Sequence, residues 1–173
     1  MVFLSINQNN YDDNSSKQNK TLIQQLNDAI GNGKNVFILF YMEGCGPCNA
    51  TRPEWNKLKN VLKKDADDEN TYIVDIEYTI AEKVSNIKRK PSSFPTIRFI
   101  SNKGNSEEDF EDSTIDDKER TVDNFVKWIE SKKNKNMTGG RSRKYRVRKN
   151  KNKNKNIKHT LKHKRKRSKR HNK

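Results

Sequence analysis

Both cysteines of the chain lie in the segment Phe40-Tyr41-Met42-Glu43-Gly44-Cys45-Gly46-Pro47-Cys48. It overlaps a continuous apolar run, Val36 to Tyr41, which is too short for a helix and predicts a central strand covered on both faces. Helical spacing follows, at Trp55, Leu58, Val61 and Leu62. The first sulfur therefore lies at a helix N-terminus, where free N–H groups and the helix dipole favour a thiolate. We expect Cys45 to be the nucleophile, and Cys48, one turn further on, to attack a mixed disulfide.

Patterns on both sides of this stretch alternate between helix and strand. Apolar residues from Leu22 to Ile30 predict a helix that ends at Gly31-Asn32-Gly33. The other expected elements are a short strand over Val2 to Ile6, a buried strand over Tyr72 to Ile76, a short helix over Thr79 to Ile87, a strand over Thr96 to Ile100, an acidic strand with Phe110, and an amphipathic helix over Val122 to Ile129. This order predicts an α/β fold.

The formal charge of +16 is unevenly distributed along the 173 residues. Residues 137–173 hold 18 of the 38 Lys and Arg and no Asp or Glu, which leaves 20 basic and 22 acidic residues for the rest. A segment so poor in apolar residues cannot offset the entropy of ordering. We therefore expect a flexible or partly extended N-terminal segment over 1–19, a folded domain over 20–136 and a disordered polybasic tail over 137–173.

The cysteine segment resembles the active-site segment of thioredoxins, and Cys-Gly-Pro-Cys is the thioredoxin form of the motif. Pro53, five residues after Cys48, matches the kinking proline of that family, and Phe94-Pro95-Thr96 opens a strand about where the family has its cis-proline. The stretch from Arg120 to Ile129 looks like the final helix of disulfide-isomerase domains. The resemblance implies a thioredoxin fold, with a central mixed sheet flanked by helices, and an enzyme that reduces or exchanges protein disulfides.

For single residues, the resemblance implies a cis peptide at Pro95, packed against the cysteines, with Phe94 and Thr96 offering backbone hydrogen bonds to an extended substrate. Gly46 and Pro47 would complete the substrate-binding surface. Alternatively, Pro95 merely starts an edge strand. The family's buried acid, six positions before the first cysteine, is replaced by Leu39, so we expect slow turnover.

No metal site is predicted in the first 136 residues. They contain two cysteines and no histidine, whereas a structural zinc site needs about four ligands. We expect no cofactor beyond the redox-active Cys45–Cys48 disulfide, protein disulfides as substrates, an unidentified reductase as partner, and a monomer. The alternative is a redox-inactive or weakly active scaffold in a basic nucleic-acid-binding or virion packaging protein.

The tail is expected to bind nucleic acid or another polyanion, or to target the protein. Its candidate contacts are Arg141, Arg143, Lys144, Arg146, Arg148, Lys164, Arg165, Lys166 and Arg167. The alternative hypotheses are nuclear import through Lys162 to Arg170, adsorption to an anionic membrane, and a merely solubilising role. The N-terminus lacks a secretory signal and no apolar run approaches the roughly 20 residues of a membrane span, so we expect a soluble intracellular protein of cytoplasm or nucleus, or of a virion if viral.

Overall fold

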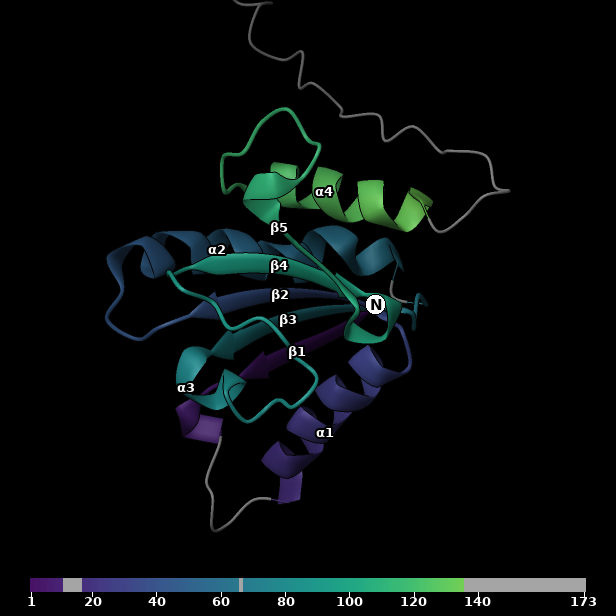
Figure 1. Cartoon of the computed structure of the whole chain (residues 1–173). Coiled ribbons are helices and arrows are strands. Elements are labelled where there is room, and N and C mark those ends of the chain that lie inside the picture. Colours follow the sequence, from purple (N-terminus) through teal and green to yellow (C-terminus); the bar gives the residue numbers. More distant parts are fainter. Residues whose placement is uncertain (11–16, 66, 136–173) are drawn as a thin grey trace, which may run out of the picture. The chain divides into compact units, whose positions relative to one another are not determined.

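A computed structural model describes residues 1–10, 17–65 and 67–135, and these belong to one compact unit, Met1–Thr138. Within the described residues, five strands form one sheet in the order β1-β3-β2-β4-β5 (Figure 1). The strands are β1 (Val2–Ile6), β2 (Asn35–Tyr41), β3 (Thr71–Glu77), β4 (Thr96–Ser101) and β5 (Ser106–Asp109). The helices are α1 (Lys17–Gly31), α2 (Gly46–Val61), α3 (Tyr78–Ala81) and α4 (Val122–Lys135).

The sheet is mixed, as expected. β3 is parallel to both of its neighbours, β1 and β2, whereas β4 is antiparallel to β2 and to β5. In the register of the three parallel strands, Asp75 lies between Ser5 of β1 and Leu39 of β2. The reactive segment follows directly from β2, the middle strand of the sheet.

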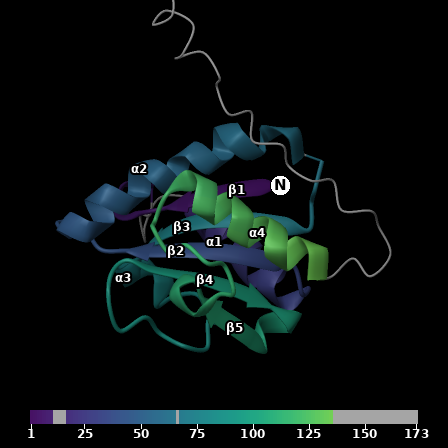
Figure 2. The same cartoon turned by 90° about the horizontal axis from the view of Figure 1, so that it is seen from above.

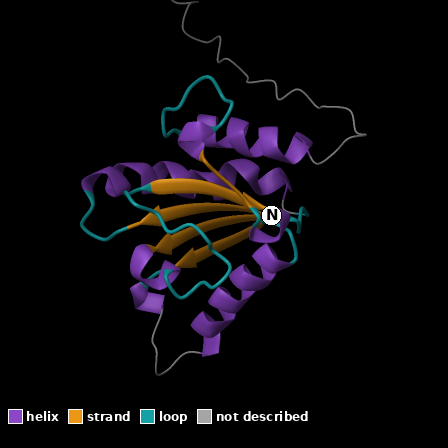
Figure 3. Ribbon diagram, viewed as in Figure 1, coloured by secondary structure: helices purple, strands orange, loops and turns teal. Residues whose placement is uncertain are grey.

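The helices cover both faces of the sheet, in three layers (Figure 3). Figure 1 shows α2 and α4 on one face and α1 and α3 on the other, and Figure 2 shows α4 and α2 side by side over the strands. Alternate residues of β2 therefore enter two separate cores. Phe37 and Leu39 pack under α2 and α4, and Ile38 and Phe40 pack against the α1 side. This two-sided burial explains why the run Val36–Tyr41 is apolar without interruption.

Two predicted elements have different limits in the structure. Phe110 does not lie in the last strand but in a 3-10 turn, Phe110–Asp112, that follows it, and its ring is fully buried. In place of the helix predicted over Thr79–Ile87, the structure has only the four residues of α3. The chain beyond α3 is not helical, because Asn27 of α1 holds it by hydrogen bonds. Asn27 Oδ1 accepts the backbone N–H of Asn86 at 3.1 Å, and the Asn27 carbonyl accepts its side-chain amide at 2.8 Å.

The expected strand Val2–Ile6 is confirmed as an edge strand of the sheet. The boundaries predicted at 19/20 and 136/137 stay predictions. The tail residues proposed to bind nucleic acid, Arg141 to Arg167, lie outside the described residues.

Candidate active site

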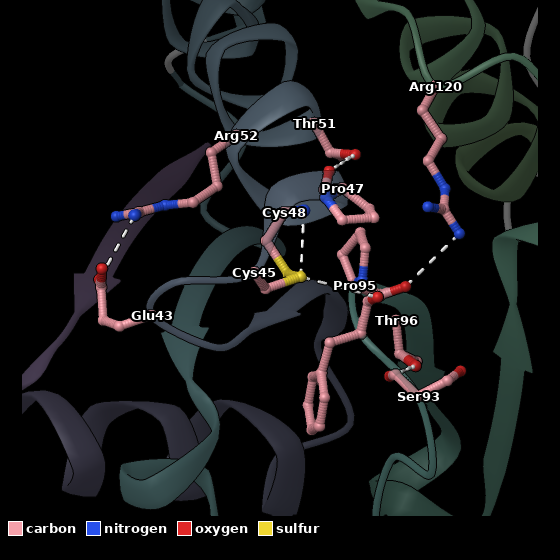
Figure 4. The surroundings of a disulfide bond; sticks show 11 residues. Glu43, Cys45, Pro47, Cys48, Thr51, Arg52, Ser93, Pro95, Thr96 and Arg120 are labelled. Carbon is pink, nitrogen blue, oxygen red and sulfur yellow. Dashed lines mark hydrogen bonds and ion pairs between the residues drawn. A yellow bond between two sulfur atoms is a disulfide. The ribbon is translucent and has the colours of Figure 1, made fainter.

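The cysteine pair lies where β2 ends and α2 begins (Figure 4). Cys45 is the N-cap residue of α2, and its Sγ accepts the backbone N–H of Cys48 at 3.2 Å. The two residues form a disulfide, with their Cα atoms 5.2 Å apart. Pro47 occupies the first turn, where its missing N–H leaves no helical hydrogen bond unmade. Cys45 Sγ thus lies at a helix N-terminus, as the sequence predicts, and this position favours its thiolate in the reduced form.

The two sulfurs differ in access to solvent. Cys45 is half-buried, whereas Cys48 is 0% exposed. Gly46 and Pro47 lie exposed between them. A substrate disulfide can therefore reach Cys45, and Cys48 can be reached only through Cys45 or from inside the protein.

The Phe94–Pro95 segment faces the disulfide from the start of β4 (Figure 4). The peptide bond is cis, which confirms the expectation for Pro95. The carbonyl oxygen of Phe94 lies 3.8 Å from Cys45 Sγ, and in the dithiol form this sulfur would carry a proton to donate to it. Pro95 is buried, Phe94 is half-buried, and the Thr96 hydroxyl donates to the Ser93 carbonyl at 2.7 Å. The structure thus brings the predicted Phe94 and Pro95 to the cysteines, while the side chain of Thr96 serves the local turn.

Arg120 supports this segment from the chain just before α4 (Figure 4). Its Nη2 donates to the carbonyl of Pro95 at 3.4 Å and to Glu111 Oε1 at 2.7 Å. The same end of α4 is fixed to the reactive helix, because Glu54 Oε2 of α2 accepts the backbone N–H of Val122 at 3.1 Å. Sequence reasoning gave Arg120 no role, since the contact joins residues 25 positions apart.

Leu39 is fully buried under α2, and its neighbour on β3 is a carboxylate. Asp75 is only 9% exposed, and its Oδ2 accepts the hydroxyl of Ser5 at 2.9 Å. Burial raises the pKa of Asp75, and the hydroxyl of Ser5 and the charge of Arg52 partly oppose that rise. Sequence reasoning missed this residue, although a single acid inside the apolar run Tyr72–Ile76 was a visible signal.

Arg52 lies one turn after Cys48 and stacks over the ring of Tyr41, with its Cζ 3.8 Å from the ring centroid. It also pairs with Glu43 at 3.4 Å (Figure 4). Burial raises the pKa of Tyr41 to about 12, with the charge of Arg52 acting against it. Among the described residues, the buried Tyr41 hydroxyl has no hydrogen-bond partner.

Clusters that could ligate a metal, with three or more His, Cys, Asp or Glu together, do not occur in residues 1–10, 17–65 and 67–135. In the same ranges, no helix has the length and apolar character to cross a membrane.

The sequence profile of the thioredoxin family matches residues 14–131. The chain is 35% identical over 104 residues to protein disulfide-isomerase of Gallus gallus, and 32% identical over 103 residues to that of Drosophila melanogaster. Each match covers 60% of this chain, which spans only 18% of the length of either relative.

The structure of human ERp44 in a zinc-bound form has the same fold. Its TM-score is 0.51 at 14% sequence identity, and the match covers 76% of this chain and 31% of that one. The profile match extends over more than half of the chain and includes β2, the cysteine pair and α4 up to Ser131. This protein therefore belongs to the thioredoxin family.

Proposed function

We propose that this chain is a thiol-disulfide oxidoreductase that reduces or exchanges disulfides of protein substrates. The observation that carries the proposal is the unequal access of the two sulfurs. Cys45 is half-buried and caps α2, whereas Cys48 is fully buried and lies in the first turn of the same helix. Met42, 45% exposed beside the pair, adds apolar surface for an extended substrate. The similarity of this chain to protein disulfide-isomerases of Gallus gallus and Drosophila melanogaster agrees with this chemistry.

The reaction has two steps. In the first, the Cys45 thiolate attacks one sulfur of the substrate disulfide, a mixed disulfide forms and one substrate thiolate leaves. In the second, Cys48 loses its proton and attacks Cys45 Sγ, which forms the Cys45–Cys48 disulfide and releases the second substrate thiolate. Two electrons pass to the substrate, and its two thiolates take up the protons that the cysteines lose. The backbone of Phe94 and Thr96 is proposed to hold the substrate chain during both steps.

Reduction of insulin by dithiothreitol tests this proposal. The wild-type chain is expected to accelerate it, and Cys45→Ser to abolish the acceleration. Cys48→Ser should instead accumulate a mixed disulfide that mass spectrometry detects, because the first step survives and the second does not. Equal rates for the wild type and Cys45→Ser would refute the enzymatic proposal and favour the scaffold alternative.

The order of attack has its own test. Limited alkylation of the reduced chain with iodoacetamide near neutral pH should label Cys45 first, because its sulfur is both accessible and stabilised as a thiolate. Mass mapping after digestion reads the site of labelling. Equal labelling of both cysteines, or faster labelling of Cys48, contradicts the assignment.

We also propose that residues 137–173 bind nucleic acid without sequence preference. Their 18 basic and no acidic residues support this, and Tyr145 is the single aromatic residue that could stack on a base. Binding should weaken with salt, with a log-log slope of about −0.9 per neutralised phosphate of duplex DNA. Fluorescence anisotropy should detect binding by the full chain and none by residues 1–136. Equal binding by both chains, or binding to anionic vesicles but not to DNA, would refute the assignment.

A further inference from the structure

A pocket of 240 Å³ opens beside the reactive helix, between α2 and the β1–β3 side of the sheet. Its lining includes Ser5, Arg52, Trp55, Asn56, Lys59 and Asp75. Ser5, Asn56 and Lys59 are exposed, so solvent can enter, and Asp75 is the buried charged group within it. A water molecule needs only about 10–15 Å³ of such space, and the lining is polar enough to hold several.

The pocket begins one helical turn away from Cys48. Arg52 and Trp55 follow Cys48 by four and seven residues, so the three side chains share one face of α2. That face is turned towards the sheet, since Cys48 and Trp55 are both buried. Asp75 lies on the sheet face below it, because it follows Ile73 by two residues and Ile73 packs in the core under α2.

Cys48 needs a proton acceptor that bulk water cannot supply directly. Its thiol must ionise before it attacks the mixed disulfide, and the side chain is fully buried. Two buried carboxylates of described residues lie on this face of the sheet, Asp75 and Glu77. Glu77 accepts hydrogen bonds from the backbone of Gln8 and from Thr79, each at 3.1 Å, at the C-terminal end of β3, opposite Tyr41. Asp75 instead borders the pocket beside the face of α2 that carries Cys48.

We propose that Asp75 accepts the proton of the Cys48 thiol through water in this pocket, and so takes the place of an acid that Leu39 does not provide. The proposal deepens the proposed disulfide exchange and rests on it. The proton passes from Cys48 Sγ through water to a carboxylate oxygen of Asp75. The thiolate then forms the bond to Cys45 Sγ, the bond from Cys45 to the substrate breaks, and the substrate thiolate is protonated by solvent. Asp75 returns its proton to water at the rim.

The charges around Asp75 fit this role. Ser5 from β1 donates to it, Arg52 and Lys59 of α2 bring positive charge to the pocket, and Tyr41 and Glu77 are its titratable neighbours on β2 and β3. Burial raises the pKa of the carboxyl, which makes it a better match for a thiol proton than an exposed aspartate. The Ser5 hydroxyl, the charge of Arg52 and the backbone of Asp75 lower this pKa but do not cancel the effect of burial.

The test follows the two steps separately, with Ellman's reagent as substrate. The first thionitrobenzoate released reports attack by Cys45, and the second reports attack by Cys48 on the mixed disulfide. In Asp75→Asn, the first release should keep its wild-type rate, and the second should slow by about tenfold or more at neutral pH. The wild-type second step should also show a rise with pH through the Asp75 titration that Asp75→Asn lacks.

Glu77→Gln is the matched control, because it removes an equally buried carboxylate two residues along the same strand. It should keep the wild-type pH profile of the second step. The double variant Leu39→Asp/Asp75→Asn moves the acid to the adjacent register position, and we expect it to recover part of the lost rate.

Failure of the two proposals can be told apart. Without a first release from Cys45, the proposed function fails. A normal first release with the same second-step profile in Asp75→Asn and wild type refutes the role of Asp75 alone, whereas a wild type that never shows a second release also refutes the two-step reaction of the proposed function. If the double variant does not fold, as judged by thermal unfolding, the Asp75→Asn profile decides by itself.

Discussion

Two buried charges in this domain have very different surroundings. Arg98 of β4 is 2% exposed, and its guanidinium is paired on all sides. It donates to Asp109 Oδ1 at 2.5 Å, to Asp109 Oδ2 at 3.3 Å and to Glu107 at 3.4 Å, and it also contacts the carbonyl of Arg89. Asp75 of β3, on the opposite face, accepts the Ser5 hydroxyl at 2.9 Å and a hydrogen bond from its own backbone, and it borders a pocket with exposed residues at its rim.

The difference separates a structural charge from one available for chemistry. A buried ion is tolerated when hydrogen bonds and opposite charges replace the water it has lost, and those partners fix its protonation state. Arg98 meets that condition and joins β4 to β5. Asp75 meets it only in part, and its raised pKa is the result. The predictions below test this contrast, from the largest expected effect to the smallest.

Arg98→Met should lower the free energy of unfolding by about 3–5 kcal/mol, because it leaves the carboxylates of Glu107 and Asp109 partly buried without their main partner. Urea denaturation measures the change. Arg89→Met is the control: Arg89 also pairs with Asp109, at 2.9 Å, but is about half exposed, so its loss should change stability by less than about 1 kcal/mol. Similar losses for both arginines would show that burial of Arg98 is not decisive.

Ser5→Ala should lower the free energy of unfolding by about 1 kcal/mol at pH values where Asp75 is ionised, because one hydrogen bond to the carboxylate is lost. It should also raise the pKa of Asp75 further, since the Ser5 hydroxyl favours the charged form. Chemical denaturation at several pH values measures both effects, and Ser5→Thr should restore them. A loss that does not depend on pH would break the link to Asp75.

Asp75→Asn should have the smallest effect on stability, and a distinctive pH dependence. The folded-state pKa of Asp75 is raised, so the folded protein binds more protons than the unfolded one between the two pKa values, and wild-type stability falls as pH rises through that window. The amide avoids this loss. The variant should therefore gain stability relative to the wild type, in thermal unfolding, as pH rises above the unfolded-state pKa of an aspartate, about 3.9. If instead the stability of the wild type rises relative to that of the variant as pH increases, the hydrogen bonds and charges around Asp75 outweigh the cost of burying its carboxylate.

Much of the fold could be predicted from local patterns. The apolar run of β2, the helical spacing of α2 and α4 and the cysteines between β2 and α2 are all readable over short windows, because burial on one face or two dictates their period. The cis bond before Pro95 followed from the family resemblance. The limit of α3 could not be predicted, since Asn27, over fifty residues away, accepts the backbone N–H of Asn86 after α3. The place of Phe110 could not be predicted either, because its ring packs against Phe125 and Trp128 of α4.

The candidate site likewise contains residues that the sequence predicts and residues that only the structure reveals. Cys45 and Cys48 are three residues apart, and their motif is recognisable from the sequence alone. The proposed role of Asp75, in contrast, depends on the strand register, which places it between Ser5 and Leu39, and on the pocket under α2. Arg120 likewise depends on a contact with Pro95 across 25 residues. Sequence patterns reveal which residues are buried, but the pairing of strands decides which polar groups meet.

The parallel pairing of β1 with β3 also has a consequence for synthesis on the ribosome. Ser5 and Asp75 are 70 residues apart. At about 5–20 residues per second, β1 is made some 4–14 seconds before β3 can receive it. During that interval the nascent chain carries an apolar strand whose partner does not yet exist. Ser5, whose hydroxyl donates to Asp75, is therefore synthesised several seconds before Asp75. The interior of the reactive site cannot be complete until β3 has been translated.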